Sequence, residues 1–374
     1  MIKLNYSQAT LDEYFARLTK EVTSKNSGIE INILDLDNEG KIKRYYKKSI
    51  LGRLKTASEI NNKKSKEIVK FYKYLIEFDI NSKSYLNLKT LLVGTPSELK
   101  KAVKFILKNF NTIKFKSVSN NKKLDDNERI LEIFNYENIR KYHGVFLLKQ
   151  LNIKVCPYCG ANNILIIERE NNKLKALCQF DHFLSQSEYP YLSASIHNLV
   201  PSCSSCNHTK LDNPRKIVNP YENSLHDSFI FKVDTKSELD FILSGYKKDN
   251  LLEIQMTPKI NNDTSQEGII TNHDAVFGTK SLYQHHTDIV AELYWKAHVY
   301  SKKYRTELKT LTNNLEKKHT LKLGKYIDEL QHLNLTDKEI KRFIIGNYIE
   351  EKDFLKRPLS KLTHDIAKEL GLLD

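Results

Sequence analysis

The apolar residues of the first 150 positions recur mostly at helical spacing, so this part of the chain is expected to be mainly α-helical. Residues 64–79 show the pattern most clearly, with lysines between their apolar positions. Two sequences match helix starts in which a Thr caps the helix and a Glu three residues later bonds back to it. They are Thr10 with Glu13 and Thr95 with Glu98, where Pro96 also takes the first helical position.

Helical spacing stops near residue 151, and shorter β-prone runs take its place. Asn163–Glu168 and Leu174–Phe180 are separated by Asn171-Asn172-Lys173, which predicts a β-hairpin. A loop and a short helix near Ser204–Leu211 are expected next. Beyond residue 221 the pattern predicts strands and then a long helical region from about Leu282. The expected strands are Phe229–Val233, Leu239–Leu243 and Leu251–Gln255.

These patterns predict an α+β protein, a mostly helical chain with a small central module that contains strands. We expect three segments: a basic, mainly helical domain at 1–150, the central module at 151–220, and a domain at 221–374 with short strands followed by helices. No apolar run approaches the roughly 18 residues that span a bilayer, and the first residues lack the apolar core of a signal peptide. The protein is therefore expected to be cytoplasmic and free of the membrane.

The positive charge lies almost entirely in the first segment. The chain has a net charge of +14, and residues 1–150 hold 30 Lys and Arg against 17 Asp and Glu. A basic lobe suits a polyanionic partner, above all nucleic acid. The excess of lysine is equally what an AT-rich genome encodes at surface positions, so charge alone decides nothing. The basic run Lys41–Lys48 has the same two explanations, a surface that follows phosphates or a solvated helix face.

Four of the five cysteines form two pairs with identical spacing, Cys156-Pro-Tyr-Cys159 and Cys203-Ser-Ser-Cys206. In a cytoplasmic chain such pairs indicate a metal site rather than disulfides. Four thiolates are the number and type of ligand that tetrahedral Zn²⁺ requires. We therefore expect a structural zinc ion in a module too small to be stable by its own core. Cys178 is expected to be a buried small residue outside this site.

Asp181-His182 lies between the two cysteine pairs and carries groups suited to hydrolysis of a phosphodiester. Such a reaction needs a base to take a proton from water and a cation to neutralise charge on the phosphate. Histidine suits the first role near neutral pH. The oxygens of Asp181 and Asn207 suit Mg²⁺ or Mn²⁺. Asn198 is expected to hold the His182 ring through its other nitrogen.

These residues resemble the HNH, or His-Me finger, nucleases. The resemblance lies within residues 156–210 and implies a ββα-metal fold, with His182 as general base, Asp181 and Asn207 as ligands of the catalytic cation, and Asn198 as the residue that positions the base. Asn207 stands where many members have His, and His208 is the alternative ligand. The matching stretch is Cys156-Pro-Tyr-Cys159, Asp181-His182-Phe183-Leu184, Tyr189-Pro190 and Asn198-Leu199-Val200-Pro201-Ser202-Cys203-Ser204-Ser205-Cys206-Asn207-His208-Thr209-Lys210.

The resemblance implies a metal-dependent endonuclease that cuts DNA. The order of its motifs is also similar to that of HNH effectors of bacterial anti-phage systems, which often act with a separate ATPase, so an ATPase or a sensor protein is an expected partner. Two alternatives stay open: an RNA-cleaving effector with the same site, and a zinc-containing nucleic-acid-binding protein without catalysis. Lys210 and Arg215 follow the expected helix, where they either contact phosphate or are ordinary surface residues.

Overall fold

The structure is a computed structural model that describes residues 3–19, 22–25, 28–31, 49–59, 66–116, 125–259, 264–301, 303–304, 306–307 and 336–373. Contacts divide the chain into two compact units, each assembled from separate stretches of sequence. The amino-terminal unit comprises Leu4–Asn152 and Ile166–Asp212, and the carboxy-terminal unit comprises Met1–Lys3, Ile153–Leu165 and Asn213–Asp374. The expected central segment 151–220 thus contributes residues to both. None of the described helices is long and apolar enough to cross a bilayer.

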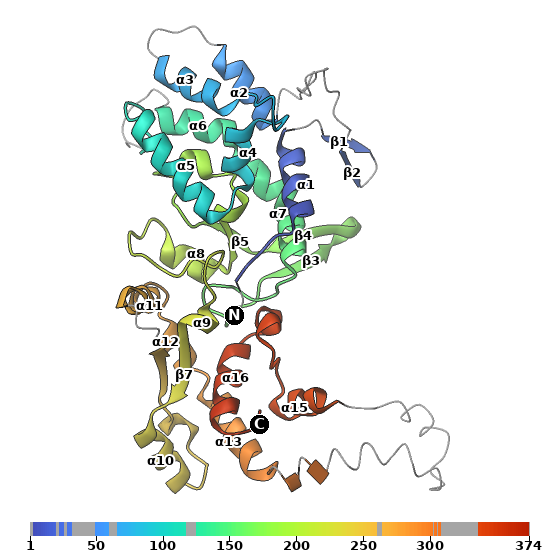
Figure 1. The fold of residues 1–374 in the computed structure, drawn as a ribbon. Coiled ribbons are helices and arrows are strands. Elements are labelled where there is room, and N and C mark those ends of the chain that lie inside the picture. Colours follow the sequence, from blue (N-terminus) through green and yellow to red (C-terminus); the bar gives the residue numbers. More distant parts are fainter. Residues whose placement is uncertain are drawn as a thin grey trace, which may run out of the picture. The chain divides into compact units, whose positions relative to one another are not determined.

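Helices α1 to α7 make up most of the amino-terminal unit, as the spacing of apolar residues predicted (Figure 1). The capping box before α5 is confirmed: Thr95 Oγ1 accepts from the Glu98 amide, and the Glu98 carboxylate accepts from the Thr95 amide. The predicted cap at Thr10 is wrong, because helix α1 begins earlier and the Ser7 hydroxyl caps it by accepting from the Thr10 amide. The helices are α1 Gln8–Thr19, α2 Ile50–Ser58, α3 Lys66–Leu75, α4 Leu86–Val93, α5 Pro96–Asn109, α6 Asp126–Phe134 and α7 Tyr136–Leu151.

The strands of this unit are short and pair two by two. The predicted second hairpin strand, Leu174–Phe180, is divided at Cys178, and its two parts enter different sheets. Its first part pairs with β3, while its second part, β5, pairs with a strand that follows twenty residues later in the chain. The strands and short helices are β1 Val22–Lys25, β2 Gly28–Ile31, β3 Leu165–Arg169, η2 Glu170–Asn172, β4 Lys173–Leu177, β5 Gln179–His182, η3 Pro190–Leu192, η4 Ile196–Asn198, β6 Leu199–Ser202 and α8 Ser204–Lys210.

The amino-terminal helices hold the loop that joins β5 to β6. Tyr191 of this loop is fully buried against Phe71 of α3 and Phe115, with ring centroids 5.9 and 5.1 Å away. Three polar groups of the helical part bond the loop backbone or a loop side chain. Tyr14 donates to the Ala194 carbonyl at 3.0 Å, Asn127 donates to the Ser187 carbonyl at 3.0 Å, and the Gly94 carbonyl lies 2.8 Å from Nδ1 of His197.

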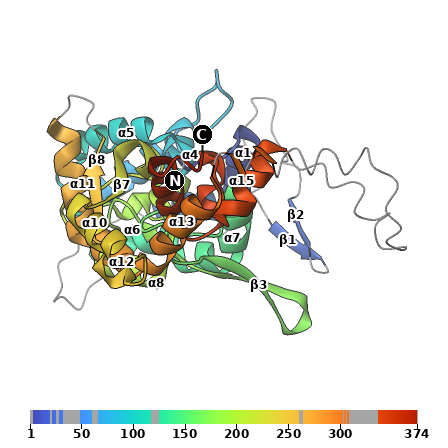
Figure 2. The same ribbon diagram turned by 90° about the horizontal axis from the view of Figure 1, so that it is seen from below.

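The carboxy-terminal unit contains one described sheet, the antiparallel pair β7–β8, covered by helices (Figures 1 and 2). The predicted strand Phe229–Val233 is confirmed. The predicted strand Leu239–Leu243 is wrong: it lies in α10, which Asp234 caps by accepting from two backbone amides. The expected strand Leu251–Gln255 begins three residues late. The elements are α9 Leu225–Ser228, β7 Phe229–Val233, α10 Thr235–Leu243, η5 Asp249–Leu251, β8 Ile254–Pro258, α11 Thr264–Phe277, α12 Thr279–Gln284, α13 Thr287–Val299, α15 Asp337–Ile345, η6 Glu351–Lys356 and α16 Ser360–Glu369.

The basic run Lys41–Lys48 lies outside the described residues, so neither explanation of it is tested.

Candidate functional site

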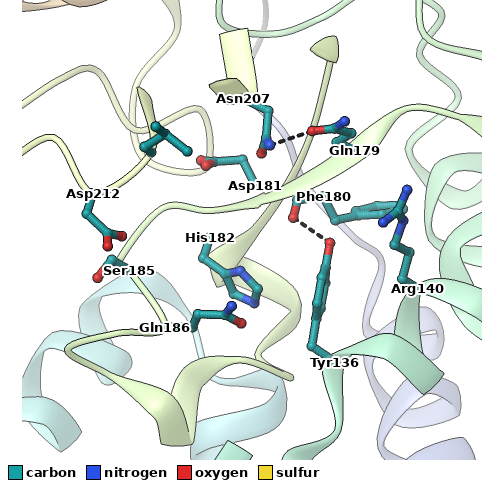
Figure 3. A pocket seen from close by; sticks show the side chains of 11 residues that line it. Tyr136, Arg140, Gln179, Phe180, Asp181, His182, Ser185, Gln186, Asn207 and Asp212 are labelled. Atoms are coloured by element: carbon teal, nitrogen blue, oxygen red, sulfur yellow. Dashed lines mark hydrogen bonds between the residues drawn. The ribbon is translucent and has the colours of Figure 1, made fainter. Parts of the chain in front are cut away.

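Two antiparallel strands and the helix that follows them carry the predicted catalytic residues. In the pairing of β5 with β6, Asp181 lies opposite Val200 and His182 opposite Leu199. The chain turns directly from β6 into α8, where Cys203 caps the helix by accepting from the Cys206 amide. Strands β5 and β6 and helix α8 together bring Asp181, His182 and Asn207 to one pocket of about 250 Å³, named here the His182 pocket (Figure 3).

The His182 ring is fixed by a backbone carbonyl. Its Nε2 lies 3.0 Å from the carbonyl oxygen of Ser193, and a carbonyl oxygen can only accept, so Nε2 carries the proton. The pKa of His182 is lowered to about 4, chiefly by burial; the Ser193 bond opposes this shift and the Lys210 ammonium adds to it. The imidazole is therefore neutral near pH 7, and Nδ1 keeps a lone pair that can accept a proton.

Tyr136 of α7 contacts both strand β5 and the His182 ring. Its hydroxyl donates to the Phe180 carbonyl at 2.7 Å, and its ring meets the His182 ring edge-on with centroids 4.5 Å apart. Figure 3 shows His182 between Tyr136 and Gln186. Because the strand backbone and the imidazole are both in contact with one tyrosine, the ring position is constrained from two directions.

Asn198 does not hold the His182 ring directly. Its amide oxygen accepts from the Leu184 amide at 2.7 Å, and its amide nitrogen donates to the carbonyls of Leu184 and Leu192 at 3.0 and 3.2 Å. The expected contact with the imidazole is instead made by Ser193, which follows Leu192. Asn198 thus fixes the two ends of the loop whose backbone holds the base.

Lys210 is buried inside the site, whereas the sequence predicted either a phosphate contact or an ordinary surface residue. It is only 4% exposed, and its Nζ lies 3.0 and 3.2 Å from the two carboxylate oxygens of Asp181. The same ammonium donates to the His182 carbonyl at 2.7 Å. The expected metal ligand therefore has an internal cation beside it. Arg215, the other expected phosphate contact, is exposed and lies in the carboxy-terminal unit.

Asn207 extends from α8 toward the pocket and donates its amide nitrogen to the Gln179 side chain. This bond leaves the Asn207 amide oxygen as a possible ligand beside Asp181, as Figure 3 shows. His208, the alternative ligand, is exposed and does not line the pocket. Asp212 lines it and accepts from Ser187 at 3.0 Å, which makes it a carboxylate that the sequence did not single out.

The four paired cysteines form one cluster. All four are buried, and their sulfur atoms lie within 4.8 Å of one another. Four soft sulfur ligands in this arrangement fit a bound metal ion and suit zinc in particular. Cys178 is not part of the cluster, as the sequence predicted, and burial raises the pKa of its thiol to about 12.

The turn that carries the first cysteine pair is held by its backbone. The Cys156 amide donates to the Asn162 carbonyl at 2.9 Å, and Gly160 closes the turn with a φ of +68°, which a side chain would disfavour. Tyr283 of α12 donates to the Cys159 carbonyl at 2.9 Å, and the His273 ring of α11 lies 2.9 Å from the Tyr158 carbonyl. The sulfur atoms of Cys156 and Cys159 are thus positioned by their own unit.

Four residues of the site, Tyr136, Gln179, Ser193 and Asp212, were not predicted from the sequence. Ser193 contributes a carbonyl, which any residue would supply, so no residue type marks it. Tyr136 contacts the strand from a helix remote in the sequence, and nothing in its local pattern distinguishes it from a core tyrosine. Gln179 and Asp212 flank the motif, and their polar side chains at a strand start and a helix end were the only available signal.

No family model, no curated protein and no solved structure matches this chain.

We expect Cys203→Ser to abolish metal binding, because it removes one of the four thiolates that could hold the ion. Metal per chain, measured by atomic emission on purified protein, should fall to near zero. Cys178→Ser is the matched control, since it changes the one cysteine outside the cluster. Equal metal content in both variants would contradict the cluster as the binding site.

Lys210→Met should lower the free energy of unfolding by about 3 kcal/mol, because it leaves the buried Asp181 carboxylate without its cation. Urea unfolding followed by circular dichroism measures this change. Lys101→Met, on the exposed face of α5, should change stability by less than about 0.5 kcal/mol. If the two variants unfolded at the same urea concentration, the Asp181–Lys210 pair would not contribute to the fold.

Proposed function

We propose that the protein is a metal-dependent endonuclease of the HNH type that hydrolyses phosphodiester bonds in DNA. The observation that carries the proposal is the neutral His182, held by the Ser193 carbonyl at a pocket that also contains Asp181 and Asn207. A zinc ion held by Cys156, Cys159, Cys203 and Cys206 would stabilise the site without taking part in the reaction.

His182 would act as the general base. Its Nδ1 takes a proton from the attacking water, while Nε2–H stays bonded to the Ser193 carbonyl and so stabilises the imidazolium that forms. A base with a pKa of about 4 is weak, but a phosphodiester that approaches the ring adds negative charge, which raises the pKa toward neutral pH. The resting site would thus keep the base unprotonated, and the substrate itself would strengthen it.

Oxygen ligands for the catalytic cation are present, and they fit Mg²⁺ or Mn²⁺. Asp181 offers a carboxylate, and Asn207 offers the amide oxygen that its bond to Gln179 leaves over. A bound cation would neutralise charge on the phosphate and on the leaving oxygen. Lys210 already shares the Asp181 carboxylate, so its ammonium lowers the affinity of this position for a second cation.

The biological setting of the proposal follows the resemblance of the motifs. We place the enzyme among effectors of anti-phage defence that work with a separate ATPase or sensor protein. DNA is the proposed substrate, and RNA is the alternative that the same site chemistry would also serve. The cleavage experiment below includes both nucleic acids, so it decides between them.

His182→Ala should lower the cleavage rate at least 100-fold, because the base contributes that much or more to hydrolysis. The assay uses supercoiled plasmid, linear duplex DNA and structured RNA, with Mg²⁺, Mn²⁺ or EDTA. The substrate whose cleavage is lost in the variant identifies the target.

His285→Ala is the matched control, since this exposed histidine lies outside the pocket, and its activity should equal that of the wild type. Unchanged metal content would show that the His182 variant keeps its fold. Cleavage by His182→Ala at the wild-type rate would contradict the role of His182 as the general base.

A further inference from the structure

A second pocket of about 510 Å³ adjoins the His182 pocket, between helix α7 and the β3–β4 hairpin. We name it the hairpin groove. Figures 1 and 2 both show the hairpin beside α7, and its far end extends away from the helix. All residues that line the groove belong to the amino-terminal unit.

The hairpin groove is strongly basic. Five of its lining residues are positively charged, all five are exposed, and Glu137 is the one acidic residue among the lining. Among the described residues, no carboxylate forms an ion pair with any of the five. Elsewhere in the unit basic side chains do find such partners, as Arg17 does with Glu13. The five are Arg140, Lys141, Arg169, Lys173 and Lys175.

The groove is continuous with the candidate catalytic site. Arg140 and Phe180 line both pockets. Arg140 lies one helical turn after Tyr136, so the two share a face of α7, and Tyr136 contacts the His182 ring. A polyanion bound along the groove would therefore contact Arg140, which also lines the His182 pocket.

We propose that the hairpin groove binds the phosphodiester backbone of the substrate on one side of the bond that is cut. Unpaired lysine and arginine side chains along a groove are the groups that bind backbone phosphates regardless of sequence. The proposal rests on the proposed nuclease function and adds to it the surface that orients the strand. No residue of the HNH-like motif lines the groove, and its positive charge comes from α7 and the hairpin.

The test neutralises the three basic residues of the hairpin together, as Arg169→Gln, Lys173→Gln and Lys175→Gln. The control neutralises three exposed lysines of α5 in the same unit, Lys101→Gln, Lys104→Gln and Lys108→Gln, and so makes the same change in net charge. Binding to a fluorescent DNA duplex, and to an RNA duplex of the same sequence, is measured by anisotropy without added Mg²⁺ or Mn²⁺ at several salt concentrations.

We expect the hairpin variant to bind roughly 10-fold more weakly or worse, and the slope of log K against log salt to fall by about 2 to 3. The α5 control should keep the wild-type slope within about one unit. In cleavage assays the hairpin variant should show a raised KM and an unchanged kcat, which separates substrate binding from the catalytic role of His182. The nucleic acid whose affinity falls identifies the backbone that the groove binds.

Equal affinities of the two triple variants for the duplexes would overturn the proposal that the groove binds the substrate backbone. Failure of the wild-type protein to bind either duplex would also overturn it. These results differ from failure of the proposed function, because binding without Mg²⁺ or Mn²⁺ is measured in the absence of cleavage. If the wild-type protein cleaves nucleic acid and the two triple variants bind it equally well, the nuclease proposal stands and only the proposed role of the groove is rejected.

Discussion

The antiparallel pairing of β5 with β6 determines where each candidate catalytic group lies. The register that sets His182 opposite Leu199 also brings α8 next to β5. Lys210 of α8 then forms an ion pair with Asp181, and Asn207 donates a hydrogen bond to Gln179. A slip of one residue would turn every side chain of β5 to the opposite face. Leu199 and Val200 are both fully buried, and adjacent strand residues point to opposite faces, so both faces of β6 are covered.

The helices of the amino-terminal unit give this short strand pair its rigidity. Two strands of four residues are marginal by themselves, since an isolated pair buries too little apolar surface. Here the loop between them contributes Tyr191 to the aromatic core, while Tyr14 and Asn127 bond its backbone. The carbonyl of Ser193 belongs to this loop, so the orientation of the imidazole depends on packing that lies well outside the motif. The helical part therefore has a structural role in the site, whatever else it binds.

The cysteine cluster was predicted from the sequence, whereas the contacts made by backbone atoms were not. Cysteine spacing identified a cluster that the structure contains, because thiol ligands are recognisable by residue type. Helix starts with a complete capping box, such as Thr95, were also predicted, since the signal is local. Leu239–Leu243 was wrong because its apolar residues suit a strand or a helix, and the cap at Asp234 decided for the helix. The pairing of Lys210 with Asp181 was not predicted, because only the fold brings these two side chains together.

The proposed role of His182 requires a neutral imidazole with its proton on Nε2 at physiological pH. The most direct test is nitrogen-15 NMR of the protein with labelled histidine, titrated from pH 8 downward, with His182→Ala used to assign the signal. We predict an Nε2–H tautomer at pH 7 and a pKa of about 4, because burial disfavours the charged ring. A ring that titrates near 6.5, or one protonated at Nδ1, would rule out a buried imidazole whose Nε2–H is held by the Ser193 carbonyl.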